Sequence, residues 1–128
     1  MNVETIREYC LSKRGVTESF PFDDVSLVIK VMNKMFALID LEEANHIALK
    51  CDPEKAIELR EHYSGIEGAY HFNKKYWNSV RFDSDVDDKL MKAILRLNIK
   101  FGEYHIIDML SDTEQLIKNV EISEKNHW

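Results

Sequence analysis

Residues 26–50 limit the fold most, because their apolar side chains alternate and two short polar turns divide them. Side chains on a β-strand point alternately to opposite faces, so this period of two predicts strands. Asn33-Lys34 has the length and composition of a tight hairpin turn, and residues 42–45 form the next turn. The stretch therefore predicts three consecutive strands, which must run antiparallel because their connections are short.

Helix signals flank these strands on both sides. Near the N-terminus, Val3, Ile6 and Cys10 recur at helical spacing, and Gly15 is a suitable residue to end that helix. After the third strand, residues 52–54 (Asp-Pro-Glu) combine a capping side chain, a proline at the first helical position and an acid near the positive end of the helix dipole. They predict a second helix that ends at Gly65.

A second hairpin and a third helix follow along the chain. Residues 69–72 and 76–82 predict two strands, with a turn at Asn73-Lys74-Lys75 between them. Ser84 or Asp85 caps the next predicted helix. The apolar stripe of that helix consists of Val86, Leu90, Ala93, Ile94 and Leu97.

The predicted fold is a single domain over residues 1–120, with 121–128 as a frayed tail. Phe101-Gly102 predicts a break, residues 104–110 fit either a helix or a strand, and a capping box at 111–114 begins a short final helix. The order is helix, three strands, helix, two strands, helix and a C-terminal helical extension. This order predicts a two-layer α+β fold, in which helices cover one face of an antiparallel five-stranded sheet.

Composition restricts the class of function. The formal net charge of −6 opposes strong binding to nucleic acid, whose binding domains are usually basic. Two cysteines without C-x-x-C spacing predict reduced thiols in a cytoplasmic protein. The N-terminus lacks the apolar run of a signal peptide, and no stretch approaches the ~20 apolar residues of a membrane span. We therefore expect a cytoplasmic protein that does not bind membranes.

Motifs for catalysis and metal binding are missing from the sequence. The five histidines show no H-x-x-x-H or H-E-x-x-H spacing, and no nucleophile or phosphate-loop motif is present. Cys51 precedes a predicted helix start, where an exposed thiol would have a lowered pKa, but a small buried cysteine is the favoured interpretation. The expectation is a protein without catalytic residues, metal or cofactor; an enzyme that uses His71 or Cys51 ranks third among the hypotheses.

The alternation also predicts which side chains point toward the core and which point away from it. The set assigned to the core is Leu27, Ile29, Val31, Ile47, Leu49, Tyr70, Phe72, Tyr76, Val80 and Phe82. The opposite, open face then carries Lys30, His46, Lys50, His71, Trp77, Ser79 and Arg81. Such a face suits an anion, a nucleobase or a peptide, although an ordinary exposed sheet face is also polar, with a tryptophan packed under long cationic side chains. A one-residue slip in register would reverse the assignment.

Four short segments together resemble the MmcQ/YjbR family of small bacterial proteins, over residues 1 to about 98. The segments are Phe20-Pro21-Phe22, Lys34-Met35-Phe36, Leu49-Lys50-Cys51-Asp52-Pro53-Glu54 and the run from Tyr70 to Asn78. The resemblance implies a fold similar to that of type III secretion chaperones, with helix, three strands, helix, two strands and helix. This order agrees with the order that the hydrophobic periodicity predicts independently.

The family is described as DNA-binding, with two hairpins that act as a double wing. The resemblance implies phosphate contacts from the residues at the two hairpin tips, which are Lys34, Asn73, Lys74 and Lys75. The usual Ser-Tyr pair of the last helix is missing near Asn98, and Glu103-Tyr104 is a candidate replacement after an insertion. This departure predicts an enlarged helical layer at that position.

The leading hypothesis is weak, phosphate-directed and largely sequence-independent DNA binding without catalysis. The residues assigned to nucleic-acid binding are Lys34, Lys50, Asn73, Lys74, Lys75, Trp77 and Arg81. In this hypothesis the charged side chains contact phosphates, Trp77 stacks on a base, and the additional open-face contacts are Lys30, His46 and His71. The alternative is a protein-interaction or chaperone-like adaptor that uses the same face or the C-terminal helices. The oligomeric state does not follow from the sequence.

Overall fold

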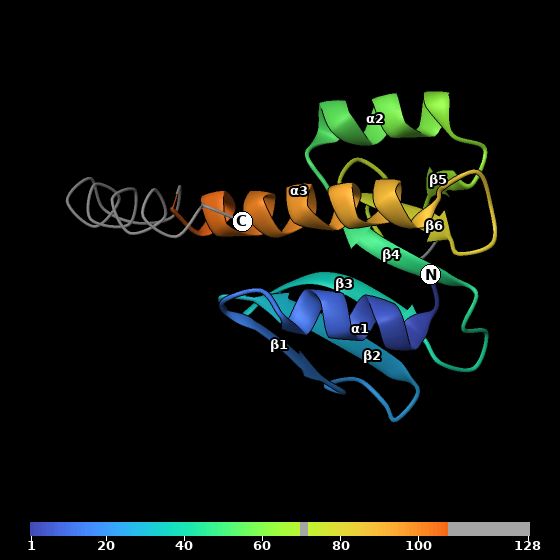
Figure 1. The fold of residues 1–128 in the computed structure, drawn as a ribbon. Helices are drawn as coiled ribbons and strands as arrows, with labels where there is room; N and C mark the ends of the chain where they lie inside the picture. The colour runs from blue at the N-terminus through green and yellow to red at the C-terminus, as the bar shows by residue number, and fades with distance from the viewer. Residues whose placement is uncertain (70–71, 108–128) are drawn as a thin grey trace.

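The structure is a computed structural model that describes residues 1–69 and 72–107 of the chain. Figure 1 shows the path of the chain through these residues. The elements are α1 (Val3–Leu11), β1 (Val16–Ser19), β2 (Ser26–Val31), β3 (Lys34–Asp40), β4 (His46–Lys50), α2 (Pro53–His62), β5 (Ile66–Gly68), β6 (Trp77–Arg81) and α3 (Asp88–Ile107).

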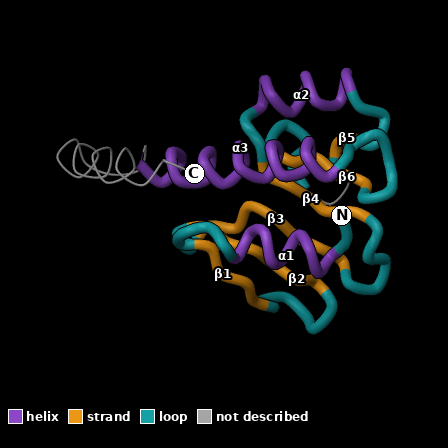
Figure 2. The backbone as a smooth tube through the Cα atoms, in the orientation of Figure 1, coloured by secondary structure: helices purple, strands orange, loops and turns teal. Residues whose placement is uncertain are grey.

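In the described ranges the strands form one six-stranded sheet in the order β1-β2-β3-β4-β6-β5, and each neighbouring pair is antiparallel. Figure 2 shows α1 and α3 lying across one face of this sheet, and α2 packs beside β5 and β6. The predicted two-layer α+β fold with helices on one face is therefore confirmed. The predicted number of strands, five, is wrong.

The main core lies between the sheet and the helices. Its sheet side carries the alternating residues of β2 and β4, which the period of two assigned to the core. Its helical side comes from α1 and α3, while Leu59 of α2 packs at its margin. The fully buried side chains that dominate this core by size include Ile6, Ile29, Phe36, Ile39, Ile47, Leu49, Met91, Leu95 and Ile99.

The first hairpin turns one residue earlier than predicted. Met32 and Asn33 form the turn with φ angles of 49° and 67°, and Val31 pairs with Lys34 across its base. Two positive φ angles in a two-residue loop are the signature of a type I′ turn, which matches the twist of the flanking strands. The register then shifts so that Phe36 has no partner on β2, and this extra residue is buried in the core.

Two strand predictions need correction because edge strands carry little signal of their own. β1 was not predicted: it is four residues long, with Val16 as its one buried residue. Hydrogen bonds to β2 define this strand, whose side chains show no apolar alternation. The fifth predicted strand, at residues 69–72, lies instead at Ile66–Gly68, because the chain leaves the sheet after Gly68.

The third helix differs from the prediction at both ends. It begins at Asp88, and the Asp87 side chain accepts a hydrogen bond from the Leu90 N–H at 2.8 Å, so Asp87 is the cap. The helix continues to Ile107 through the predicted break at residues 101–102. An interior glycine costs only about 1 kcal/mol, which a 20-residue helix tolerates.

The face of α3 that packs on the sheet also differs in part from the predicted stripe. Ile94 is buried as expected, but Leu97 is 46 % exposed, and Met91, Leu95 and Ile99 complete the buried side.

None of the described helices combines the length and hydropathy of a membrane span. The predicted final helix, which begins with the capping box at 111–114, and the predicted frayed tail at 121–128 lie outside the described residues.

Candidate nucleic-acid interface and open-face groove

The strand register places the predicted polar residues on the face opposite the helices. Lys30 of β2 pairs with Met35 of β3, Lys50 of β4 pairs with Trp77 of β6, and His46 pairs with Arg81. These pairs alternate with core residues, as the period of two predicts. Ser79 lies on the same face, and His71 lies outside the described residues.

The predicted stacking residue Trp77 is covered by another aromatic ring. Phe72 stacks on it with ring centroids 4.5 Å apart and an interplanar angle of 24°. Trp77 is only 8 % exposed and forms a small second cluster with Ala48 and Ala69. Phe72 and Tyr76, which were assigned to the main core, pack on this open-face cluster, so that assignment is wrong. Because Phe72 occupies a face of the indole, Trp77 is poorly placed to stack on a nucleobase.

The antiparallel topology brings both lysine-bearing hairpins to one end of the sheet. Lys50 ends β4 beside Trp77, which begins β6, so the β5–β6 loop emerges at the same end as the β2–β3 turn. In Figure 1 this is the side toward which the β4 arrow points. We call this region the lysine end and define it by Lys30, Lys34, Lys50, Lys74 and Lys75.

The side chains of the lysine end differ in exposure and in local role. Lys34, Lys74 and Lys75 are exposed, whereas Lys30 and Lys50 are half-buried on the sheet. Asn73 shapes its own turn, because its side chain accepts a hydrogen bond from the Lys75 N–H at 3.0 Å. The predicted phosphate contact from Asn73 would therefore compete with a hydrogen bond that builds the loop.

Two more groups define the surroundings of the lysine end. Arg14 belongs beside it, because the neighbouring Gly15 carbonyl accepts a hydrogen bond from the Met32 N–H of the hairpin turn at 3.0 Å. The fold therefore places Arg14 next to the β2–β3 turn, which directly precedes Lys34. Acidic groups also follow Lys50 directly, since Asp52 caps α2 and Glu54 lies in its first turn.

The opposite end of the sheet collects acidic turns. This acidic end consists of Asp23, Asp24, Asp40, Glu42, Glu43, Asp83, Asp85, Asp87 and Asp88. Several of these carboxylates hold backbone amides: Asp85 accepts hydrogen bonds from the Gly65 and Ser64 N–H groups at 2.8 and 2.9 Å. These bonds lower the pKa of Asp85, as bonds from the Ser26 and Val25 N–H groups lower that of Asp23.

Arg81 and His46 belong to the acidic end, although they share a face with Lys30 and Lys50. Arg81 is four residues along β6 from Trp77, which corresponds to roughly 13 Å along the strand. His46 Nδ1 is 2.7 Å from the Asn45 side-chain oxygen and 3.5 Å from a Glu43 carboxylate oxygen. The predicted set of site residues therefore divides into two groups at opposite ends of the sheet.

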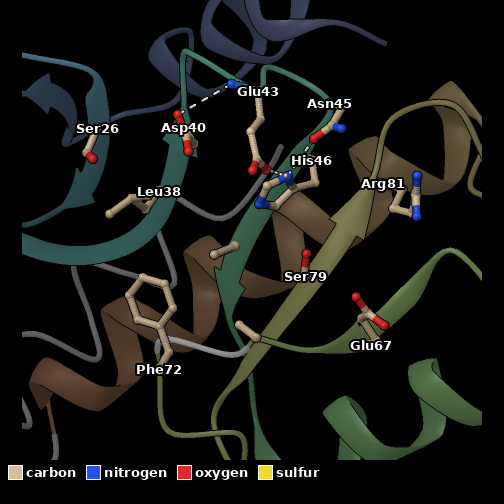
Figure 3. A pocket seen from close by; sticks show the side chains of 12 residues that line it. Ser26, Leu38, Asp40, Glu43, Asn45, His46, Glu67, Phe72, Ser79 and Arg81 are labelled. Carbon is tan, nitrogen blue, oxygen red and sulfur yellow. Dashed lines mark hydrogen bonds and ion pairs between the residues drawn. The ribbon is translucent and has the colours of Figure 1, made fainter.

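A groove of about 540 Å³ opens on the acidic half of this face (Figure 3). Its apolar residues are Leu38, Ala48, Ala69 and Phe72, and its charged side chains include both signs. We call it the open-face groove, and the remaining residues that line it are Ser26, Asp40, Glu43, Asn45, His46, Glu67, Ser79 and Arg81. Sequence alternation found His46, Ser79 and Arg81, but it missed the acidic members and Phe72.

The cysteines are buried thiols. Burial raises the pKa of Cys51 to about 11 and that of Cys10 to about 12, so both are protonated at neutral pH. Cys51 is 3 % exposed, which agrees with the favoured interpretation of a small core residue. Over residues 1–69 and 72–107, no three His, Cys, Asp or Glu side chains gather as a metal-binding group.

Comparison with known proteins places the fold in a family. The model of the YjbR family matches residues 11–97. Escherichia coli K12 protein YjbR is 32 % identical over 89 residues, which cover 69 % of this chain and 75 % of that protein. YbdF of Escherichia coli O157:H7 is 31 % identical over 93 residues, with coverage of 72 % and 76 %.

Solved structures show the same architecture. The crystal structure of a Deinococcus radiodurans protein with a DUF419 domain superposes with a TM-score of 0.71 at 34 % identity, and covers 92 % of this chain and 88 % of its own. A Pseudomonas syringae protein superposes with a TM-score of 0.67 at 23 % identity, and covers 80 % of this chain and 99 % of its own. The second likeness concerns the fold alone. With the family match over most of the domain, these findings show that the chain belongs to the MmcQ/YjbR family.

Proposed function

We propose that the lysine end binds the phosphate backbone of nucleic acid, weakly and with little sequence preference. The observation that carries this proposal is the convergence of Lys34 with Lys74 and Lys75 at one end of the sheet. Two loops with exposed lysines at the same end of a sheet are suited to contacting a charged backbone together. Lys50 and Lys30 extend the positive charge from the tips onto the sheet.

Charge segregation makes this binding compatible with the net charge of −6. The acidic turns lie at the far end of the strands, so a polyanion at the lysine end is kept away from most of them. Repulsion from the whole molecule still lowers affinity, and it is screened beyond about 8 Å at physiological salt. The charges that act on a phosphate are therefore the local ones.

The proposed interface is smaller than the one that the sequence suggested. Trp77 is covered by Phe72, and Arg81 and His46 lie among carboxylates, so we leave all three outside it. The contacts that remain are cation–phosphate contacts, which carry no sequence information. This composition supports binding without base readout and without catalysis, with an affinity that falls steeply as salt rises.

The test is an anisotropy titration of labelled duplex and single-stranded DNA at low and at physiological salt. The lysine variant is Lys74→Ala/Lys75→Ala, and the matched control is Arg81→Ala/Lys89→Ala, which removes the same charge at the other end. We expect binding at low salt that weakens in the lysine variant. The log–log salt slope should also fall by about 2 in that variant, close to one unit per lost phosphate contact.

Three results would refute this proposal. The first is the absence of binding to either DNA at low salt. The second is an equal loss in the two double variants, because that would show a response to net charge and not to the lysine end. The third is a loss confined to the control variant, because that would assign the contact to Arg81 and to the sheet face.

A further inference from the structure

We infer that the open-face groove is a binding site for a free α-amino acid with a large apolar or aromatic side chain. The groove extends from the middle of the sheet toward the acidic end, and none of the residues that define the lysine end lines it. This inference therefore does not rest on the proposed function. It rests on three features: opposite charges on two adjacent strands, an apolar floor beside them on the same face of the sheet, and a volume that suits a small molecule.

The first feature is a pair of opposite charges on the β5–β6 wall. Glu67 pairs in register with Ser79, and Arg81 follows two residues later on the same face. Among the described residues, neither the Glu67 carboxylate nor the Arg81 guanidinium takes part in a hydrogen bond or ion pair. The two residues are diagonal neighbours on adjacent strands, roughly 7–8 Å apart. An α-amino acid carries an ammonium and a carboxylate on one carbon atom, so it can bridge this pair.

The charges on the other wall are already engaged. Asp40 accepts hydrogen bonds from the N–H groups of Glu42 and Glu43 at 2.9 and 3.5 Å. A Glu43 carboxylate oxygen in turn lies 3.5 Å from His46 Nδ1, and a dashed line marks this contact in Figure 3. This contrast assigns the ligand's charged groups to the β5–β6 wall, where Arg81 binds a carboxylate through two parallel N–H groups and Glu67 binds the ammonium.

The second feature is the apolar floor. Leu38 and Ala48 pair across β3 and β4, and Ala69 lies beside them in the second cluster. Phe72 borders the hollow, and its stack on Trp77 holds the ring in place. An apolar or aromatic side chain of the ligand would bury surface against this floor, which a glycine ligand could not do.

The third feature is size. The groove volume of about 540 Å³ lies within the range of roughly 300–1,000 Å³ that is usual for small-ligand sites. A few polar groups beside an apolar floor are also typical of such sites, because the polar groups orient the ligand and the floor supplies most of the affinity. Because the groove is open to solvent, the expected affinity is in the millimolar range.

The experiment is an NMR titration of the full chain with L-phenylalanine, followed by backbone amide shifts. Two analogues each remove one charge: phenylalanine amide lacks the carboxylate, and N-acetyl-phenylalanine lacks the ammonium. We expect saturable shifts at Leu38, Ala48 and Phe72. Each analogue should bind at least about tenfold more weakly, the loss that one charge-assisted contact can account for, and glycine should bind more weakly as well.

Charge-removing variants then assign each contact. The Arg81→Gln variant should bind phenylalanine and phenylalanine amide with equal affinity. The Glu67→Gln variant should bind phenylalanine and N-acetyl-phenylalanine with equal affinity. Lys89→Gln and Glu61→Gln make the same charge changes at exposed sites outside the groove, and they should retain the wild-type ranking. All four positions are exposed, so the variants should fold.

The inference is overturned by any of three outcomes. The first is the absence of saturable shifts in the groove at millimolar phenylalanine. The second is a ranking of ligands that Arg81→Gln and Glu67→Gln leave unchanged. The third is tighter binding of a short apolar peptide, such as diphenylalanine, than of the free amino acid, since that would identify a peptide site. Failure of DNA binding would leave all of these readouts unaffected.

Discussion

Gly65 is the residue whose substitution tests the packing of the acidic end most directly. It is buried between α2 and β5, where its N–H donates to Asp85 and its carbonyl accepts from the Arg81 N–H at 2.9 Å. A Cβ atom added here would lie 2.5 Å from the Ser84 Cβ and 3.0 Å from an Asp85 carboxylate oxygen. Rotation of the Ser84 hydroxyl cannot relieve the contact with its Cβ, so the loop after β6 must move.

The expected cost of Gly65→Ala follows from this contact. Forcing an extra methyl group into a packed site costs about 1–3 kcal/mol in free energy of unfolding. Loss of the Asp85 hydrogen bonds adds to this cost, while the smaller entropy of the unfolded chain opposes it by about 0.4–1 kcal/mol. A net loss of about 1–3 kcal/mol corresponds to a fall in Tm of roughly 4–12 °C for a domain of this size. Such a loss is a large part of a typical domain stability of about 5–15 kcal/mol.

The measurement is urea and thermal unfolding followed by circular dichroism, on Gly65→Ala, Ser84→Gly and the double variant. Ser84→Gly removes the clashing atoms, but it also loses the hydrogen bonds of the Ser84 hydroxyl with the Arg81 carbonyl and the Val86 N–H. The double variant should therefore be at least about 1 kcal/mol more stable than the sum of the single effects. Additive single effects, or a Gly65→Ala protein as stable as the wild type, would refute the reasoning.

Three further outcomes are expected. Phe72→Ala should uncover Trp77, and faster hydrogen exchange of the indole N–H would show it; an unchanged rate would mean that the stack does not protect the ring. The hydrogen bond from Arg7 lowers the pKa of the Glu18 carboxyl in the folded protein. The stabilisation that ionised Glu18 contributes is therefore present above pH ~4.5, and it is lost as pH falls through the lower folded-state pKa. Glu18→Gln should flatten that part of the pH–stability curve, and an unaltered curve would contradict this assignment. Burial raises the pKa of Cys51 from its ordinary value of 9.0 to about 11. The free energy of unfolding should therefore decline as pH rises from about 9 to 11, because the thiol ionises more readily in the unfolded chain. Unfolding measured across this pH range should show a weaker decline for Cys51→Ala. A decline of equal size in the variant would assign it to other groups.

Local signals in the sequence predicted the central part of the fold. The alternation of residues 26–50 predicted β2, β3 and β4, and the Asp-Pro-Glu segment predicted the start of α2 at Pro53. Both signals act over a few residues: a strand exposes alternate side chains to water, and a cap satisfies amides within one turn. Asp52 accepts a hydrogen bond from the Lys55 N–H at 3.2 Å, as its position in the sequence predicts.

The predictions from sequence were wrong where contacts between residues far apart in the chain define the structure. β1 and β5 are edge strands of four and three residues, and they exist because a neighbouring strand offers hydrogen-bonding groups. Asp85 looked like a helix cap, but it holds the amides of Ser64 and Gly65, about 20 residues earlier in the chain. Phe72 was assigned to the main core because its pattern suggested a strand, whereas it crosses onto the open face to cover Trp77.

The same contrast between local signals and long-range pairing applies to the two candidate sites. The sequence by itself determined which side chains share a face, because alternation along a strand is a local property of the backbone. It could not determine at which end of the sheet each side chain lies, since that depends on the pairing of strands far apart in the chain. Only the tertiary structure brought Lys34 and Lys74 to one end of the sheet and put Arg81 beside Glu67 at the other. It thereby separated the proposed phosphate-binding surface from the groove that we infer to bind a zwitterion.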